Sequence, residues 1–193
     1  MALPRLDGWL ADASVRTCHR RSGLVGPDEL WGAAQTVRLG DTRALGRLVR
    51  WRIPGTPAEQ SFGELFRSYP FTVLEEGPRS LVSGLCGRIW TLSRDYPALA
   101  GEDAFRRWNE KGTVRVLFAH WVQALDHGRS ELVSEARVQP TDARAALRLR
   151  ALWAAVGPCE RLVGAEALTA AVRQAESQVA PRARGRRAAS SSR

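Results

Sequence analysis

Histidine is the residue type with the widest chemical use, and this chain has three of them, His19, His120 and His127. A zinc site needs Cys, His or acidic ligands at short spacings, and none of the three has such neighbours. His127 stands in Asp126-His127-Gly128, which is typical of a hairpin turn, so we expect it to be solvated. The sequence therefore predicts no metal and no cofactor, and His120 is the histidine of interest.

Nucleophilic catalysis has no support in the sequence. There is no Gly-x-Ser-x-Gly motif, and no cysteine has a base beside it. The three cysteines, Cys18, Cys86 and Cys159, are far apart. An odd and sparse set of cysteines argues against a disulfide framework and is typical of a reducing compartment. We therefore expect a cytoplasmic protein.

His120 lies in a predicted strand, residues 113–125, whose side chains alternate between two faces. The face that carries His120 is the more apolar one, and we expect it to turn inward. Its members are Val114, Val116, Phe118, His120 and Val122. A buried imidazole must find a partner or a water, and inside a cavity it can act as a general acid or base.

Two charged residues of the next predicted strand, residues 129–139, leave two alternatives open. Glu135 and Arg137 share one face of this strand, which is the solvent face in the simpler reading. In the other reading, both side chains line a cavity and contact the polar end of a ligand. Because a one-residue slip exchanges the two faces, the sequence alone does not decide the register.

The strongest local pattern is a predicted amphipathic helix over residues 141–176, with Thr141 as its N-cap. Its apolar positions recur at steps of three and four, and they include Val156 and Val163. Proline removes a helical hydrogen bond, so Gly157-Pro158 predicts a kink near residues 154–158. We expect this helix to pack on a sheet and in part to roof a cavity.

The remaining elements form a strand–helix–helix–strands order. Strands are predicted over residues 14–21, 70–76, 80–86 and 87–93, with helices that begin near Asp28, Thr42 and Ser61 and a short one at 102–108. Gly84 and Gly87 are interpreted as bulges that curve the sheet. The predicted fold class is α+β, with a lead-in (1–13), one domain (14–178) and a disordered Arg/Ser-rich tail (179–193).

The net charge of +9 is unevenly distributed. All but one of the 29 basic residues are arginine, and five of these fall in residues 182–193, where there is no acid. This tail could contact nucleic acid or an anionic surface, but it lacks interleaved aromatic residues, and we favour a solvated tail. No apolar run is long enough to cross a bilayer, and the N-terminus does not resemble a secretory signal, so we expect no membrane insertion.

Three segments carry a family resemblance. They are Gly84-Leu85-Cys86-Gly87-Arg88-Ile89-Trp90, Ser134-Glu135-Ala136-Arg137-Val138 with Pro140-Thr141-Asp142, and Leu152-Trp153-Ala154-Ala155-Val156-Gly157-Pro158. Over about residues 14–176 the chain resembles the SRPBCC superfamily, which includes START domains and polyketide cyclase/dehydrase-like proteins. The last segment is similar to a Trp…Gly-Pro break in uncharacterised bacterial members. The resemblance implies a helix-grip fold, in which a curved antiparallel sheet wraps around the C-terminal helix and encloses an apolar cavity. It carries over no catalytic residue.

We therefore expect a hydrophobic small molecule, lipid- or polyketide-like, to bind between the sheet and the final helix. The predicted ligand-binding residues are Trp90, Val116, Phe118, His120, Glu135, Arg137, Val156 and Val163. Aromatic walls such as Trp90 suit apolar ligands. Two alternatives stay open: a cyclase/dehydrase-type enzyme that uses the same cavity with His120 or Glu135, or a nucleic-acid or anionic-surface binder that acts through the basic tail.

Overall fold

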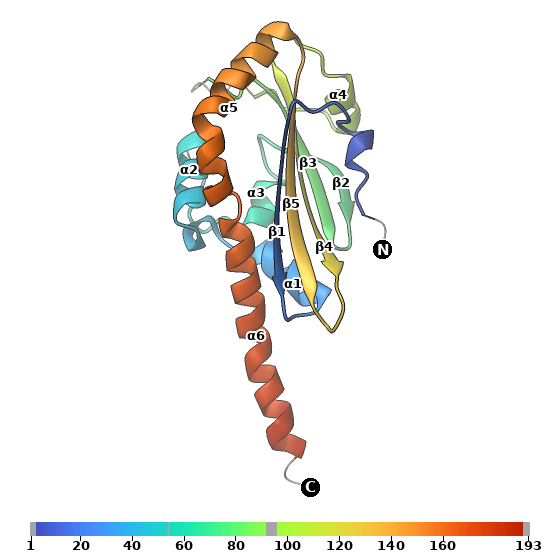
Figure 1. The fold of residues 1–193 in the computed structure, drawn as a ribbon, viewed down its shortest axis with the longest axis vertical. Coiled ribbons are helices and arrows are strands. Elements are labelled where there is room, and N and C mark those ends of the chain that lie inside the picture. The colour runs from blue at the N-terminus through green and yellow to red at the C-terminus, as the bar shows by residue number, and fades with distance from the viewer. Residues whose placement is uncertain (1–2, 54, 92–95, 191–193) are drawn as a thin grey trace.

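The chain folds around one antiparallel sheet of five strands in the order β1-β5-β4-β3-β2 (Figure 1). The strands are β1 (Val15–Gly23), β2 (Thr72–Gly77), β3 (Ser80–Gly87), β4 (Val114–Ala124) and β5 (Ser130–Pro140). The structure is a computed structural model. It describes residues 3–53, 55–91 and 96–190, without the side chains of residues 158, 159, 161–163 and 180–190.

Helices follow β1, precede β4 and end the chain. After a short 3-10 turn, η1 (Leu6–Gly8), they are α1 (Pro27–Thr36), α2 (Ala44–Arg52), α3 (Phe62–Leu65), α4 (Glu102–Arg107), α5 (Ala143–Val163) and α6 (Glu166–Ser190). A second 3-10 turn, η2 (Leu39–Asp41), lies between α1 and α2. Figure 1 shows α2, α5 and α6 on one side of the sheet, and α4 with the N-terminal segment on the other. This arrangement confirms the α+β, helix-grip prediction.

Alternation along β4 divides the core into two parts. Val116 and Val122 face the helices, whereas Leu117, Ala119 and Trp121 face the N-terminal segment and α4. Both faces of the sheet are apolar, because the helices cover one face and the N-terminal segment with α4 covers the other. The prediction that the Val116 face turns inward is confirmed.

The N-terminal segment packs on the sheet more closely than a lead-in would. Leu6, Trp9 and Leu10 are buried in the same cluster as Phe105 and Trp121. The boundary predicted at residue 14 therefore does not mark the beginning of the packed core. Helix α6 extends into residues 179–190. The side chains from residue 180 onward lie outside the described part, so the proposed role of the tail stays a prediction.

The final helix differs from its prediction in where it breaks. Helix α5 runs through Gly157-Pro158, and the chain leaves the helix only at Gly164 and Ala165 before α6 begins. A single helix over 141–176 is therefore wrong. Gly164 makes this break a point of close approach, because a Cβ placed there would lie 2.3 Å from His19 Nε2.

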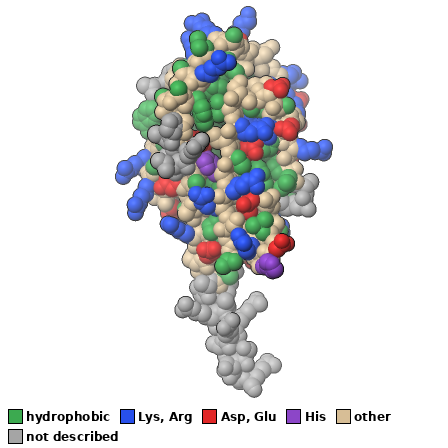
Figure 2. All heavy atoms as spheres, viewed as in Figure 1, with side chains coloured by type: hydrophobic (Ala, Val, Ile, Leu, Met, Phe, Trp, Pro, Cys, Tyr) green, Lys and Arg blue, Asp and Glu red, His purple; other side chains and the backbone are tan. Residues whose placement is uncertain are grey.

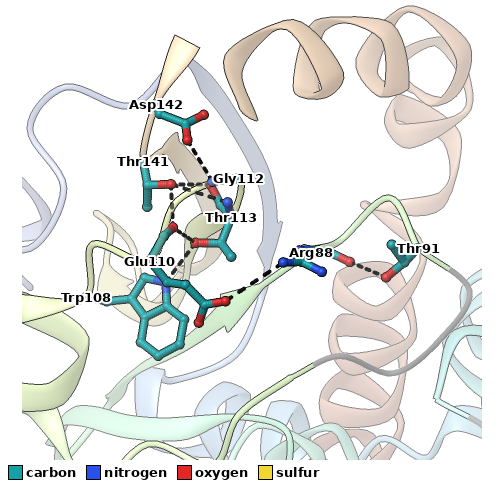
Figure 3. Close-up of polar contacts among 8 residues, drawn as sticks. All are labelled: Arg88, Thr91, Trp108, Glu110, Gly112, Thr113, Thr141 and Asp142. Carbon is teal, nitrogen blue, oxygen red and sulfur yellow. Dashed lines mark hydrogen bonds and ion pairs between the residues drawn. The ribbon is translucent and has the colours of Figure 1, made fainter. Parts of the chain in front are cut away.

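The beginning of α5 is fixed by Asp142, not by Thr141. The Asp142 side chain accepts hydrogen bonds from Ala145 N and Gly112 N, both at 2.7 Å. The Thr141 hydroxyl instead contacts the carbonyls of Glu110 and Thr113 at 2.8 and 2.9 Å (Figure 3). These bonds join the end of β5 and the beginning of α5 to the loop that leads into β4.

Two β-strand predictions also change. The first concerns the strand predicted at 87–93. Gly87 is the last residue of β3, residues 88–91 are not strand, and residues 92 and 93 lie outside the described part of the chain. Gly84 is not a bulge, because the β3–β4 register is continuous there; the irregularity lies in β2, between Val73 and Glu75. Gly84 is needed for space instead: a Cβ would lie 2.6 Å from the Phe105 ring.

The described residues contain neither a helix that could span a membrane nor a metal-binding cluster. None of their helices combines the length and hydropathy that crossing a membrane requires. No group of three or more His, Cys, Asp or Glu side chains among them is arranged to hold a metal ion.

Candidate ligand cavity

A cavity of about 540 Å³ lies between the sheet and the helices. Strands β1, β3, β4 and β5 supply its floor, helices α1, α2 and α3 its walls, and α5 and α6 its roof. Most of its lining is apolar. Apolar lining residues include Trp31, Val37, Leu45, Val49, Phe62, Phe66, Phe71, Phe118, Leu132, Ala136, Val156, Ala167 and Leu168. Figure 2 shows the molecule from the same side as Figure 1. Hydrophobic side chains gather in the upper half of the face seen there, and basic side chains lie at the edges of that face.

His120 is a polar residue of this cavity whose ring lies among aromatic side chains. Its ring centroid lies 4.4 Å from that of Phe66, which also contacts the Phe118 ring at 5.4 Å. The Nε2 atom is buried and has no hydrogen-bond partner among the described residues. Burial disfavours the charged imidazolium and lowers the pKa of His120 to about 4. At neutral pH the cavity therefore contains an uncharged imidazole with an unused hydrogen-bonding atom.

The strand register places two more polar side chains beside His120. His120 on β4 pairs with Ser134 on β5, and Ser134 pairs with His19 on β1. Residues paired across adjacent strands point to the same face, so the three side chains form a row across the floor of the cavity. All three line the cavity. We call His120, Ser134 and His19 the polar row.

Glu160 meets the end of the polar row from the roof. Its Oε1 lies 2.6 Å from His19 Nε2, and both side chains line the cavity. His19 is 15% exposed and Glu160 24% exposed. The absence of a side chain at Gly164 leaves the space in which the His19 ring fits against the helix break. This contact joins β1 to the end of α5.

Helix α2 forms a wall that is held at its beginning. The Glu166 carboxylate, in the first turn of α6, accepts hydrogen bonds from Ala44 N at 3.0 Å and Leu45 N at 2.8 Å, and also from Arg43 N. These backbone hydrogen bonds lower the pKa of Glu166. Glu166 thus supplies the cap that α2 lacks in its own sequence, where the N-cap residue Arg43 makes no side-chain cap.

Three of the predicted ligand-binding residues line the cavity: Phe118, His120 and Val156. Val116 and Trp90 belong to a neighbouring cluster with Leu149 and are not lining residues. Trp90 is nevertheless incompletely satisfied, since its buried Nε1 has no partner among the described residues. The side chain of Val163 is outside the described part of the structure.

Glu135 and Arg137 do not reach the cavity. The alternative in which both side chains line it and contact the polar end of a ligand is therefore wrong. Their β5 neighbours Ser134 and Ala136 line it, so Glu135 and Arg137 point to the opposite face. They are not a solvent face either. Arg137 is buried and contacts Glu135 Oε1 at 2.6 Å, Asp7 Oδ1 at 2.5 Å and the Leu10 carbonyl at 2.8 Å. The hydrogen bond and charge of Arg137 lower the pKa of Asp7.

Ser134, His19 and Glu160 were not predicted as site residues. A signal existed for Ser134 and His19, because both alternate with outward-pointing residues in predicted strands. No local pattern relates His19 to Glu160, which is 141 positions away. Their contact depends on the helix break at Gly164, which the predicted kink placed elsewhere.

A second hollow, of about 450 Å³, lies at the beginning of α5. It is lined by Arg88, Lys111, Gly112, Asp142, Arg144 and Arg148. Asp142 already occupies the positive end of α5, and Arg88 lies 4.0 Å from Glu110 (Figure 3). This basic hollow is separate from the apolar cavity, and we do not assign a ligand to it.

The fold and the cavity define an α+β protein with an internal, mainly apolar compartment between a sheet and its C-terminal helices. No family model matches the chain, and no curated protein sequence matches it. Among solved structures, seven chains are similar to this one. A hypothetical protein from Helicobacter pylori has 10% identity and a TM-score of 0.39 over 91% of this chain and 95% of that one.

The second solved structure is the Zhui aromatase/cyclase from a Streptomyces species, with 16% identity and a TM-score of 0.34 over 86% of this chain and 95% of that one. The third is Ara h 8.0201, with 15% identity and a TM-score of 0.29 over 84% and 98%. Likenesses of this size assign neither a family nor an activity.

Proposed function

We propose that this protein binds a largely apolar small molecule in the cavity between the sheet and helices α5 and α6. The observation that carries the proposal is a cavity of about 540 Å³ whose lining is mostly apolar and which contains a buried polar atom, His120 Nε2, with no partner among the described residues. Binding sites for small molecules are typically about 300–1,000 Å³, apolar, and supplied with a few placed polar groups.

Packing energetics support the same proposal. Protein interiors are close-packed, and side chains that border an empty space lose dispersion contacts. Here several large side chains, among them Phe62, Phe66 and Phe71, border the cavity without filling it. A bound apolar molecule would supply the missing contacts and remove apolar surface from water.

A cavity-filling substitution tests the proposal. Ala167 in α6 lines the cavity, whereas Ala154 in α5 is exposed and is not a lining residue. We expect Ala167→Phe to weaken the binding of Nile red at least tenfold in a fluorescence titration, and the matched Ala154→Phe to leave it unchanged. Circular dichroism checks that both variants fold. Equal affinity in both variants would mean that the dye binds elsewhere and would reject the proposal.

Catalysis in the same cavity is the second candidate, and the polar row favours it. General acid–base catalysis uses imidazole and carboxylate groups, and His120, His19 and Glu160 all line the cavity. For a cyclase/dehydrase-type enzyme, a suitable probe is a β-hydroxy ketone, which loses water when a base removes the α-proton and the hydroxyl departs with a proton. Mass spectrometry detects the loss of water. If the parent protein releases water from this probe no faster than the His120→Phe variant does, the candidate is rejected.

A further inference from the structure

The polar row limits what the polar part of a ligand can be. His120, Ser134 and His19 stand on three adjacent strands, so neighbours in the row are separated by roughly 5 Å, the spacing between strands. Glu160 already contacts His19 at one end. At the other end, the buried Nε2 of His120 has no hydrogen-bond partner among the described residues, and Ser134 is paired with it on the next strand. Within the polar row, the hydrogen-bonding groups that Glu160 does not contact are therefore those of His120 and Ser134.

Charge within the cavity disfavours an anionic ligand. No arginine or lysine is among the described residues that line it, and Glu160 is the carboxylate there. His19, the other imidazole among the described lining residues, already contacts that carboxylate. A ligand carboxylate would have to leave water without an arginine or lysine partner among these lining residues, which is unfavourable in an apolar site.

The chemistry of a neutral imidazole narrows the choice further. Depending on its tautomer, Nε2 of a neutral histidine either donates or accepts a hydrogen bond. A hydroxyl group can do both, so it matches His120 in either tautomer, and it also matches the hydroxyl of Ser134. A carbonyl group or an ether can only accept.

We propose that the ligand of this cavity is an uncharged apolar molecule that bears a hydroxyl group, phenolic or alcoholic, which hydrogen-bonds to His120 Nε2 beside Ser134. This inference rests on the proposed function and adds the polar group that the site selects. Fatty acids and other carboxylates are excluded as preferred ligands, although their chains are apolar enough for the cavity.

A series of pyrenes that differ in one substituent at the same carbon tests the inference. Hydroxypyrene, methylpyrene and pyrenecarboxylate have the same fluorescent skeleton, and Trp31 in the cavity wall provides an energy-transfer donor. At neutral pH we expect hydroxypyrene to bind about three- to tenfold more tightly than methylpyrene, the effect of one net hydrogen bond. We expect pyrenecarboxylate to bind least tightly.

Substitution of His120 connects this preference to the proposed atom. In His120→Phe, which keeps a ring against Phe66, hydroxypyrene and methylpyrene should bind equally. In Ser134→Ala, which serves if His120→Phe does not fold, the preference should decrease. His127→Asn is the control: it removes an exposed histidine at a positive φ that asparagine tolerates, and the preference should stay that of the parent.

The outcomes separate this inference from the proposed function. If all three pyrenes bind but methylpyrene or pyrenecarboxylate binds most tightly, the hydroxyl inference is overturned and the apolar binding function stands. The inference is equally overturned if the preference for hydroxypyrene persists in both His120→Phe and Ser134→Ala. If neither the pyrenes nor Nile red bind to the parent protein, the proposed function itself fails.

Discussion

His19 on β1 and Glu160 in the last turn of α5 hold the floor and the roof of the cavity together, with 2.6 Å between Nε2 and Oε1. The two residues lie 141 positions apart in sequence. Both are largely withdrawn from solvent, at 15% and 24% exposure, so the contact is less screened than a surface pair. The contact therefore links the position of α5 to the edge of the sheet.

Removal of the Glu160 carboxylate should destabilise the protein moderately. We expect Glu160→Gln to lower the free energy of unfolding by about 1–2 kcal/mol in urea denaturation, because a hydrogen bond between partly buried groups is weakened. Glu59→Gln, at an exposed position, should change it by less than about 0.5 kcal/mol. A double-mutant cycle with His19→Ala should give a coupling energy of at least about 0.5 kcal/mol. No coupling would mean that the two side chains act independently.

Gly164 should resist the substitution that normally stabilises a helix. Its φ of −63° and ψ of −26° suit alanine, but the added Cβ would lie 2.3 Å from His19 Nε2 and 3.0 Å from Glu160 Oε1. Gly164→Ala should therefore separate the pair and lower the melting temperature. In α1, a Cβ at Gly32 would meet nothing within 4 Å. Gly32→Ala should therefore raise the melting temperature, because alanine is more favourable than glycine inside a helix by about 0.5–1 kcal/mol.

Gly164→Ala made in the His19→Ala variant decides whether the clash with His19 causes the loss of stability. There the obstructing ring is absent, and Gly164→Ala should be neutral or stabilising. If Gly164→Ala destabilises both backgrounds equally, the helix break needs glycine for another reason, and the proposed space for His19 is wrong.

Arg137 should contribute far more to stability than a surface arginine. Its side chain is 6% exposed and contacts Glu135, which is 13% exposed, as well as the Leu10 carbonyl and Asp7. Arg137→Met should lower the free energy of unfolding by about 2–4 kcal/mol, because it leaves the largely buried Glu135 carboxylate with only the half-exposed Arg16, at 3.7 Å, as an ion-pair partner. The matched Arg107→Met removes only an exposed pair with Asp103 and should change stability by less than about 0.5 kcal/mol.

A second measurement locates the effect of Arg137. Because Arg137 holds Asp7 and the Leu10 carbonyl, hydrogen exchange of the backbone amides in residues 6–10 should accelerate in Arg137→Met and not in Arg107→Met. Unchanged protection of this segment would show that its other contacts, which are its apolar packing and the hydrogen bonds to Glu75 and Arg106, hold it without Arg137.

Much of the fold could be predicted because its signals are local. The alternation in β4 and β5, the hairpin turn at His127 and Gly128, and the Ser61 cap of α3 each depend on a few neighbouring residues, and all are present. The break in the final helix was misplaced for the opposite reason. Pro158 is the local signal for a break, whereas the observed one at Gly164 coincides with close contact between distant segments.

The site was harder to predict because it depends on register and on distant contacts. His120 was found from the strand period alone, but Glu135 and Arg137 could be excluded only once Ser134 was paired with His120. The N-terminal segment, which supplies Asp7 to Arg137, had no pattern to indicate that it covers the second face. Glu160 could not be assigned before the path of α5 over β1 was known.

His120 should make the stability of the protein depend on pH between about 4 and 6.5. Burial lowers its pKa in the folded protein from 6.5 to about 4, so in this range the unfolded chain binds a proton that the folded chain does not. The free energy of unfolding should therefore be unaffected by His120 above pH 6.5 and fall as the pH decreases towards 4. The full loss corresponds to about 3 kcal/mol.

The His120→Phe variant isolates this contribution from that of every other titrating group. Urea denaturation at intervals from pH 4 to pH 7 should show a steeper decrease for the parent than for the variant, and the two curves should become parallel above about pH 6.5. A ligand that hydrogen-bonds to the neutral ring should increase the difference, because it binds the folded state with His120 unprotonated. Curves that are parallel over the whole range would show that His120 is protonated as readily in the folded protein as in the unfolded chain, and that its ring is open to water.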